Sequence, residues 1–278
     1  MAKREIKVSK CSKEILSNLV KQMVTVNKFV TMKIDAEKTS AIGYFPSHDV
    51  VKMYNVDNTS LFEGVDTHEK PIRVSLVNGL EILQALKNYR TDEDIDVVLH
   101  IDDEDEGDEF YAYRMSFVSE RLRVELSCAD KNFSERTMSP IPQPTLERLF
   151  DTTNKNCSFV IDVPNMESIK SLSAIDKSVR SFGYATDTNG EVRIYEKRFA
   201  DEESGENDYY VYNMQIVSDA VGEFEKHSYM CNKNIFSIMQ NNAWKVNICK
   251  SDNKIIYDCG NEATGEQVTI IGVINDII

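Results

Sequence analysis

The sequence predicts an α+β protein of two similar domains, each made of two strand–helix–three-strand units. Four amphipathic helical segments occur along the chain, and each one follows an extended segment and precedes about three strand-like segments. The first two helices are offset by 67 residues (Glu14 to Glu81), and so are the last two (Glu167 to Asn234). A fixed period of this kind indicates repeated units that bury their apolar faces against neighbours.

The helical segment at residues 164–181 shows the pattern most clearly. Its apolar residues recur three or four positions apart, which predicts one buried face made of Ile169, Leu172, Ile175 and Val179. The opposite face carries only small and basic residues, namely Lys170, Ser173, Ala174, Lys177 and Arg180. A positive helix face is unexpected in a chain whose formal net charge is −14.

Three other segments have the same character, at residues 12–25, 78–90 and 232–242. Their predicted buried residues are Ile15, Leu16, Leu19, Val20 and Met23 in the first, Leu80, Leu83 and Leu86 in the second, and Ile235, Phe236 and Met239 in the third. Their basic residues lie on the polar side or at the helix end: Lys13, Lys21, Lys87, Arg90 and Lys233.

Strands are predicted from β-branched and aromatic alternation and from turn punctuation such as TDTNGE and KSDNK. The four units contain these predicted strands: 4–8, 27–34, 39–45 and 49–55; then 72–77, 95–101, 110–118 and 121–128; then 157–163, 183–188, 191–199 and 209–217; and finally 226–231, 244–250, 254–259 and 267–274.

Between the second and third units lies a connector, residues 135–156, in which SPIPQPT holds three of the chain's six prolines. Proline fixes φ, so the sequence predicts an extended, semi-rigid strap. The predicted boundaries are residues 1–134 for the N-terminal domain, 135–156 for the connector and 157–278 for the C-terminal domain.

Acidic residues are concentrated in two stretches. Residues 91–109 hold eleven Asp or Glu and no Lys or Arg, and residues 201–208 hold five more acids. Without these sixteen the balance would be +2, so binding to DNA is compatible with the composition. The chain has no run of about 18 apolar residues and its first residues lack a signal-peptide core, so a cytoplasmic protein is expected.

Together these features resemble the DNA sliding clamps, the processivity factors of DNA polymerases. The segments KVSKCSKEILSNLV, SLVNGLEILQAL and PIPQP are similar to stretches of the clamps of T-even-type tailed phages. The resemblance implies a clamp fold, with helices lining a ring of six similar domains and sheets outside. Two domains per chain then imply a homotrimer, which encircles duplex DNA and tethers the replicative polymerase, in host cytoplasm if a phage encodes it.

The resemblance also implies site residues and partners. We expect the polar helix sides to face DNA through Lys13, Lys21, Lys87, Arg90, Lys170, Lys177, Arg180 and Lys233. Clamps take short apolar peptides from the polymerase and from an ATP-driven clamp loader, and the candidates for that pocket are Ile141, Pro142 and Ile277. In the clamp pattern, residues 121–127 pair with residues 209–217 of a neighbouring chain, with Arg121, Arg123, Val124, Tyr210, Tyr212 and Met214 at the boundary and Arg121 and Arg123 approaching the acids of 201–208.

An enzyme is not expected, because the sequence lacks the motifs of P-loop, Rossmann, zinc-protease and serine-hydrolase sites. No catalytic residue, cofactor or metal is predicted. The acidic run beginning at Asp102 fails as an EF-hand, since Tyr113 occupies the twelfth position, where a bidentate Glu is required. The alternative function is an acidic, β-rich adaptor or DNA mimic that forms no ring.

Overall fold

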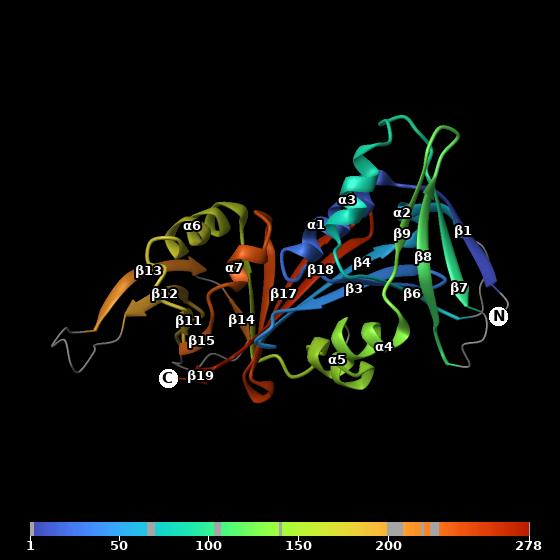
Figure 1. Ribbon diagram of the computed structural model, residues 1–278. Helices are drawn as coiled ribbons and strands as arrows, with labels where there is room; N and C mark the ends of the chain where they lie inside the picture. The colour runs from blue at the N-terminus through green and yellow to red at the C-terminus, as the bar shows by residue number, and fades with distance from the viewer. Residues whose placement is uncertain are drawn as a thin grey trace. The chain divides into compact units, whose positions relative to one another are not determined.

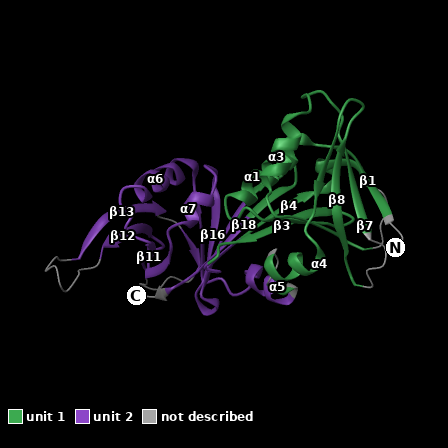
Figure 2. Cartoon of the chain, in the orientation of Figure 1, with its two compact units in different colours: residues 1–46, 52–142, 260–268 green, residues 47–51, 143–259, 269–278 purple. Residues whose placement is uncertain are grey.

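The computed structural model describes residues 3–65, 70–102, 107–138, 141–198, 208–217, 220–222 and 228–277. The chain divides into two compact units, coloured separately in Figure 2. Unit 1 contains residues 1–46, 52–142 and 260–268, and unit 2 contains residues 47–51, 143–259 and 269–278. Segment 260–268 thus belongs to unit 1, although the sequence places it in the C-terminal domain.

The structure confirms the α+β class and contains all four repeats (Figure 1). The first is β1 (Lys3–Cys11), α1 (Lys13–Val24), β2 (Val30–Ile34), β3 (Lys38–Tyr44) and β4 (Val50–Asp57), and the second is β6 (Ile72–Leu76), α3 (Leu80–Lys87), β7 (Asp96–Asp102), β8 (Phe110–Val118) and β9 (Arg123–Ser127). The third is β10 (Cys157–Ile161), α6 (Val163–Ser173), β11 (Ser181–Thr186), β12 (Val192–Arg198) and β13 (Tyr209–Val217), and the fourth is β15 (Ser228–Asn232), α7 (Ile235–Ile238), β16 (Trp244–Cys249), β17 (Lys254–Asn261) and β18 (Glu266–Val273).

The remaining elements are short. They are α2 (Asn58–Leu61), β5 (Phe62–Val65), α4 (Lys131–Phe133), a π-helical turn (Ser134–Met138), α5 (Gln143–Phe150), β14 (Val221–Gly222), a 3₁₀ turn (Lys250–Asp252) and β19 (Asp276–Ile277). No helix in the described ranges is both long and apolar enough to cross a membrane.

Starting beside β4, the sheet of unit 1 follows the strand order β3–β2–β6–β8–β7–β1–β5, with β9 also paired to β8. All of these pairings are antiparallel except β6 with β8. Helices α1 and α3 pack together and bury Leu19, Met23, Ile82 and Leu86 at their base. The apolar residues that alternate along β2 and β6 complete this core.

Unit 2 contains two groups of strands. One follows the order β14–β10–β16–β17 and the other β13–β12–β11–β15–β19. Helices α6 and α7 lie side by side, and their buried residues include Ile169 and Phe236. The ring of Phe236 packs 4.4 Å from that of Phe182 on β11, measured between centroids. Trp244, the first residue of β16, is also buried.

Helix α1 agrees with its prediction, because Ser12 caps its first turn by accepting a hydrogen bond from the Ile15 N–H at 3.3 Å. The others are shorter than predicted. Helix α6 ends at Ser173 rather than 181, and Ile175, predicted to be buried, is 62% exposed. Helix α7 is a single turn. Helix α3 buries Ile82, Ala85 and Leu86, while Leu80 at its first position is 45% exposed.

The predicted extended strap is wrong, because the connector is mostly helical. Pro144 lies in the first turn of α5, where its missing N–H has no intrahelical partner to lose, so this proline begins a helix rather than preventing one. The start of the connector is held on unit 1 by buried hydroxyl groups: Ser134, the residue just before it, hydrogen-bonds to Ser75, which lies 3.1 Å from the Thr31 hydroxyl. The Tyr44 hydroxyl also donates to the Thr137 carbonyl at 2.7 Å.

Candidate nucleic-acid interface

Three of the predicted DNA-facing cations are exposed on the helix layer of unit 1. Lys21 is in the last turn of α1, Lys87 is the last residue of α3, and Arg90 follows α3. Helices α1 and α3 pack against each other, so these cations belong to one layer (Figure 1). Exposed lysine and arginine side chains of this kind attract phosphate through a non-directional field, without reading bases.

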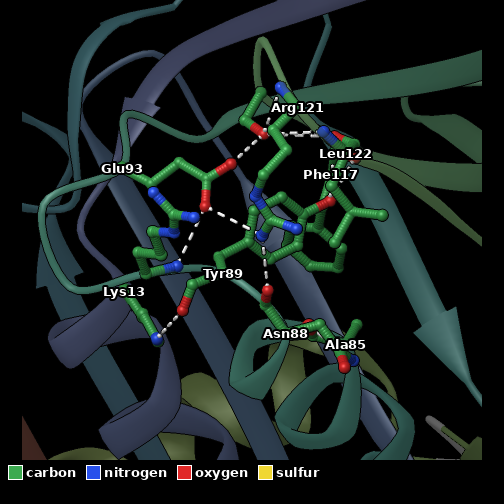
Figure 3. A network of polar contacts seen from close by, with 10 residues as sticks. Lys13, Ala85, Asn88, Tyr89, Glu93, Phe117, Arg121 and Leu122 are labelled. Carbon is green, nitrogen blue, oxygen red and sulfur yellow. Dashed lines mark hydrogen bonds and ion pairs between the residues drawn. The ribbon is translucent and has the colours of Figure 1, made fainter.

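Lys13 and Lys170 have a different role, since each binds a backbone carbonyl near the end of a neighbouring helix. The Lys13 ammonium donates to the Tyr89 carbonyl at 2.7 Å, as Figure 3 shows. The Lys170 ammonium donates to the Met239 carbonyl at 2.6 Å, and burial lowers the pKa of Lys170. A cation at a helix C-terminus satisfies an unpaired carbonyl and complements the helix dipole.

Lys177 and Arg180 are exposed, but they lie on a turn rather than on a helix face. The turn forms because the Asp176 carboxylate accepts hydrogen bonds from the Ser178 N–H at 2.8 Å and the Ser178 hydroxyl at 2.6 Å. An aspartate bonded two residues ahead stabilises a turn in competition with helix. We call residues 176–180 the basic turn.

Lys233 does not project as an exposed cation, because its side chain is only 11% exposed. Its ammonium lies 2.9 Å from a carboxylate oxygen of Glu196, whose side chain is fully buried. It also donates to the Asp176 carbonyl at 2.6 Å. Sequence reasoning missed Glu196, although a signal was present: this acid follows Val192 and Ile194 at alternating positions on the buried face of β12.

In unit 1 a polar network surrounds Glu93 between α3 and the β8–β9 turn (Figure 3). Arg121 donates to the Asn88 carbonyl at 2.7 Å and lies 3.2 Å from the Glu93 carboxylate. The Ser119 hydroxyl and the Arg90 N–H, the latter at 2.9 Å, also donate to that carboxylate. The hydrogen bond from Ser119, that from Arg90 and the Arg121 charge, in this order, lower the pKa of Glu93 to about 2.

The two strands expected at a subunit boundary are both at sheet edges. Within the described residues, β9 pairs only with β8 and β13 pairs only with β12. Val124 and Met214 are half-buried, Tyr210 is 54% exposed, and Tyr212 is buried with its hydroxyl donating to Glu196 at 3.1 Å. Arg121 and Arg123 each have an acidic partner within the chain, Glu93 and Glu125. Of their expected acidic partners at 201–208, Asp208 lies 2.6 Å from the Lys197 ammonium within the chain, and residues 201–207 lie outside the described residues.

The candidate peptide-binding residues fall in both units. Ile141 is half-buried and Pro142 is exposed, and both belong to unit 1. Ile277 belongs to unit 2, where its backbone pairs with Tyr229. Sequence reasoning missed the anchor of α5, the buried Lys254, whose ammonium donates to the Arg148 carbonyl at 2.8 Å.

No family model and no curated protein matches the sequence. Solved structures do match along almost the whole chain. The Entamoeba histolytica proliferating cellular nuclear antigen (PCNA) is 11% identical with a TM-score of 0.65, covering 98% of this chain and 99% of its own. The A. fulgidus PCNA bound to the C-terminal region of FEN-1 is 11% identical with a TM-score of 0.63, covering 98% of both chains. PCNA from Thermococcus kodakaraensis is 11% identical with a TM-score of 0.61, and the match covers 96% of this chain and 99% of the PCNA chain. The chain therefore has the PCNA-type clamp fold.

Proposed function

We propose that this chain is a sliding clamp, a non-enzymatic protein whose ring encircles duplex DNA and tethers a DNA polymerase. The observation that carries the proposal is the position of the exposed cations. In a chain of net charge −14, Lys21, Lys87, Arg90, Lys177 and Arg180 all lie on or beside the helix layers of a clamp fold. Such contacts are weak and interchangeable, which suits a protein that must move along DNA.

The edge positions of β9 and β13 among the described strands support ring formation. A long unpaired edge invites pairing with another chain, and a head-to-tail contact between different edges closes a ring when the rotation is right. Two units per chain then give a homotrimer of six similar units. The chain carries no nucleotide-binding motif, so a separate ATP-driven loader would open the ring.

Peptide binding is the second part of the proposal. One of the similar structures is a PCNA with the C-terminal region of FEN-1 bound, which supports a peptide-binding role for this fold. We assign that role here to Ile141 and Pro142 on the connector and to Ile277 near the C-terminus. The local likeness to T-even-type phage clamps makes a phage polymerase and its loader the first partners to test.

Retention on DNA of defined topology tests the proposal. The protein is incubated with a nicked circular duplex and a loader, and unbound protein is removed at moderate salt. A ring stays on the circle and slides off after one restriction cut, whereas a protein bound only by surface charge behaves alike on circular and linear DNA. A monomer in light scattering with no topological retention would instead support the acidic adaptor or DNA mimic, which the excess of 46 acids over 32 bases favours.

The subunit contact is tested with a proline in β9. In the register of β8 and β9, the Glu125 N–H faces away from β8. Glu125→Pro removes this donor from the open edge, so folded monomers are expected in place of trimers in light scattering. Glu125→Ala keeps the donor and is the matched control, expected to remain trimeric. A Glu125→Pro protein that still runs as a trimer would show that the contact uses other strands.

A further inference from the structure

The basic turn needs support from elsewhere in unit 2, because α6 ends before it begins. Helix α6 stops at Ser173 and β11 starts at Ser181, so residues 176–180 lie outside regular structure. The bond between Asp176 and Ser178 shapes the turn locally but does not fix it to the rest of the unit. Two exposed cations, Lys177 and Arg180, depend on this segment for their position.

Lys233 holds both ends of the basic turn. Its backbone N–H donates to the Arg180 carbonyl at 2.9 Å, and its side-chain ammonium donates to the Asp176 carbonyl at 2.6 Å. The residue lies between β15 and α7, two elements of the packed layer of unit 2. The side chain of Lys233 therefore binds the first residue of the turn, and its backbone binds the last.

Glu196 in turn holds Lys233. Its carboxylate is fully buried and lies 2.9 Å from the Lys233 ammonium, and it also accepts a hydrogen bond from the Tyr212 hydroxyl at 3.1 Å. Glu196 and Tyr212 face each other directly in the register of β12 and β13, beside an irregularity between Glu196 and Lys197. A chain of contacts thus runs from the edge strand β13 through Glu196 and Lys233 to the basic turn.

We propose that Glu196 and Lys233 are positioning residues for DNA binding, which fix the basic turn relative to strand β13. This assignment rests on the proposed clamp function for its DNA readout. Lys233 then serves the DNA-facing surface through the turn it holds, and does not touch phosphate itself. Glu196, an acid, contributes to binding a polyanion because it keeps Lys233 in place.

The charge balance of the pair gives a direct test. Glu196→Gln combined with Lys233→Met removes one negative and one positive charge, so the net charge is unchanged. The non-directional field that attracts DNA is then nearly constant, and lost retention reports the position of the turn. The Gln side chain still offers Tyr212 an acceptor, and removal of both members of a buried ion pair is compatible with folding.

The matched control is a half-buried ion pair at the start of β12, formed by Arg193 on the strand and Glu191 just before it. Arg193 lies 2.9 Å from Glu191, and in the part of the chain that the structure describes neither residue hydrogen-bonds to the basic turn. Glu191→Gln combined with Arg193→Gln also keeps the net charge. We expect the Glu196/Lys233 double variant to shorten the dwell time on circular DNA by about fivefold or more, and the control to leave it unchanged.

A cycle with the turn itself separates positioning from general destabilisation. Lys177→Ala with Arg180→Ala should shorten the dwell time directly. If Glu196 and Lys233 act only through these two cations, adding their double substitution to this background should cause little further loss. An equal additional loss in that background would overturn the assignment.

Hydrogen exchange supplies a readout that needs no DNA. In the free protein, the Glu196/Lys233 double variant should exchange the amides of residues 176–180 about fivefold faster or more, with the control pair at the wild-type rate. Unchanged exchange in a folded double variant would refute the proposal. If wild-type protein shows no topological retention, the clamp function fails, while the exchange result still decides whether this pair holds the turn.

Discussion

Two acidic networks, one in each unit, connect an edge strand to a segment that carries candidate DNA-facing cations. In unit 1, Glu93 joins Arg121, which precedes β9, to the backbone of Arg90 (Figure 3). In unit 2, Glu196 joins Tyr212 on β13 to Lys233 and hence to the basic turn. The arrangement is alike, but the surroundings differ: Glu93 is 13% exposed and Arg121 46%, whereas Glu196 is fully buried and Lys233 only 11% exposed.

The exposure of each network decides the direction of the pKa shift. Glu93 keeps access to water, so hydrogen bonds from Ser119 and Arg90 dominate and hold the pKa of Glu93 low, at about 2. Burial dominates at Glu196 and raises its pKa, although Lys233 and Tyr212 act in the opposite direction. In unit 1 the contacts therefore favour the charged form of Glu93. In unit 2 burial outweighs the contacts and disfavours the charged form of Glu196.

The largest expected effect comes from removing the cation of the buried pair. Lys233→Met leaves Glu196 inside the protein without its ammonium partner, and the variant should lose about 2–3 kcal/mol at neutral pH, because protonation of the acid limits the cost. Urea unfolding measures the loss. Adding Glu196→Gln should restore most of it, since no buried charge then remains. A single variant as stable as wild type would mean that solvent reaches Glu196.

The pH dependence of stability should have opposite signs at the two acids. The pKa of Glu93 is lowered in the folded state, so its stabilisation is present above the ordinary value of 4.5 and is lost as pH falls from 4.5 to about 2. The pKa of Glu196 is raised by burial, so its charge costs stability at neutral pH and acidification towards 4.5 relieves that cost. The groups facing Glu196 are Lys233, Tyr212 and Asp176.

Variants isolate each acid in this experiment. The free energy of unfolding is measured against pH for wild type, Glu93→Gln and Glu196→Gln. The advantage of wild type over Glu93→Gln should shrink on acidification below 4.5, whereas wild type should gain relative to Glu196→Gln as pH falls from 7. If the free energies of unfolding of wild type and Glu196→Gln changed in parallel with pH, the conclusion that burial raises the pKa of Glu196 would be contradicted.

The periodicity of apolar residues was sufficient to predict the four repeats, but it did not predict where the helices end. The apolar spacing at Ile169 and Leu172 predicted α6 correctly, and extending the same spacing to Ile175 was wrong, because it ignored the bond from Ser178 to Asp176 that forms a turn. A short polar residue two positions after an aspartate was the signal available. In the connector, Pro144 was interpreted as keeping the chain extended, although proline is also favoured in the first turn of a helix.

The positively charged residues in the sequence indicated a basic layer. They did not show which cations are exposed to DNA and which hold other parts of the protein in place. Lys21 and Lys233 look alike in sequence, since each lies within two positions of an apolar residue of a helical pattern. The structure leaves Lys21 exposed and buries Lys233 against Glu196. Their difference depends on an acid 37 residues away in sequence, and such long-range pairing leaves no local pattern.

The smallest expected effect is in the exposed network of unit 1. Arg121→Ala removes the ion pair to Glu93 and the hydrogen bond to the Asn88 carbonyl, yet Ser119 and the Arg90 N–H still bind the Glu93 carboxylate. Water can replace an exposed guanidinium, so stability should fall only slightly and the loss should diminish as salt is added. Urea unfolding at low and high salt measures this. Lys233→Met should lose the same stability at both salt concentrations, because its partner is shielded from ions in solution. A salt-independent loss for Arg121→Ala would show that the two networks are less different than their exposure indicates.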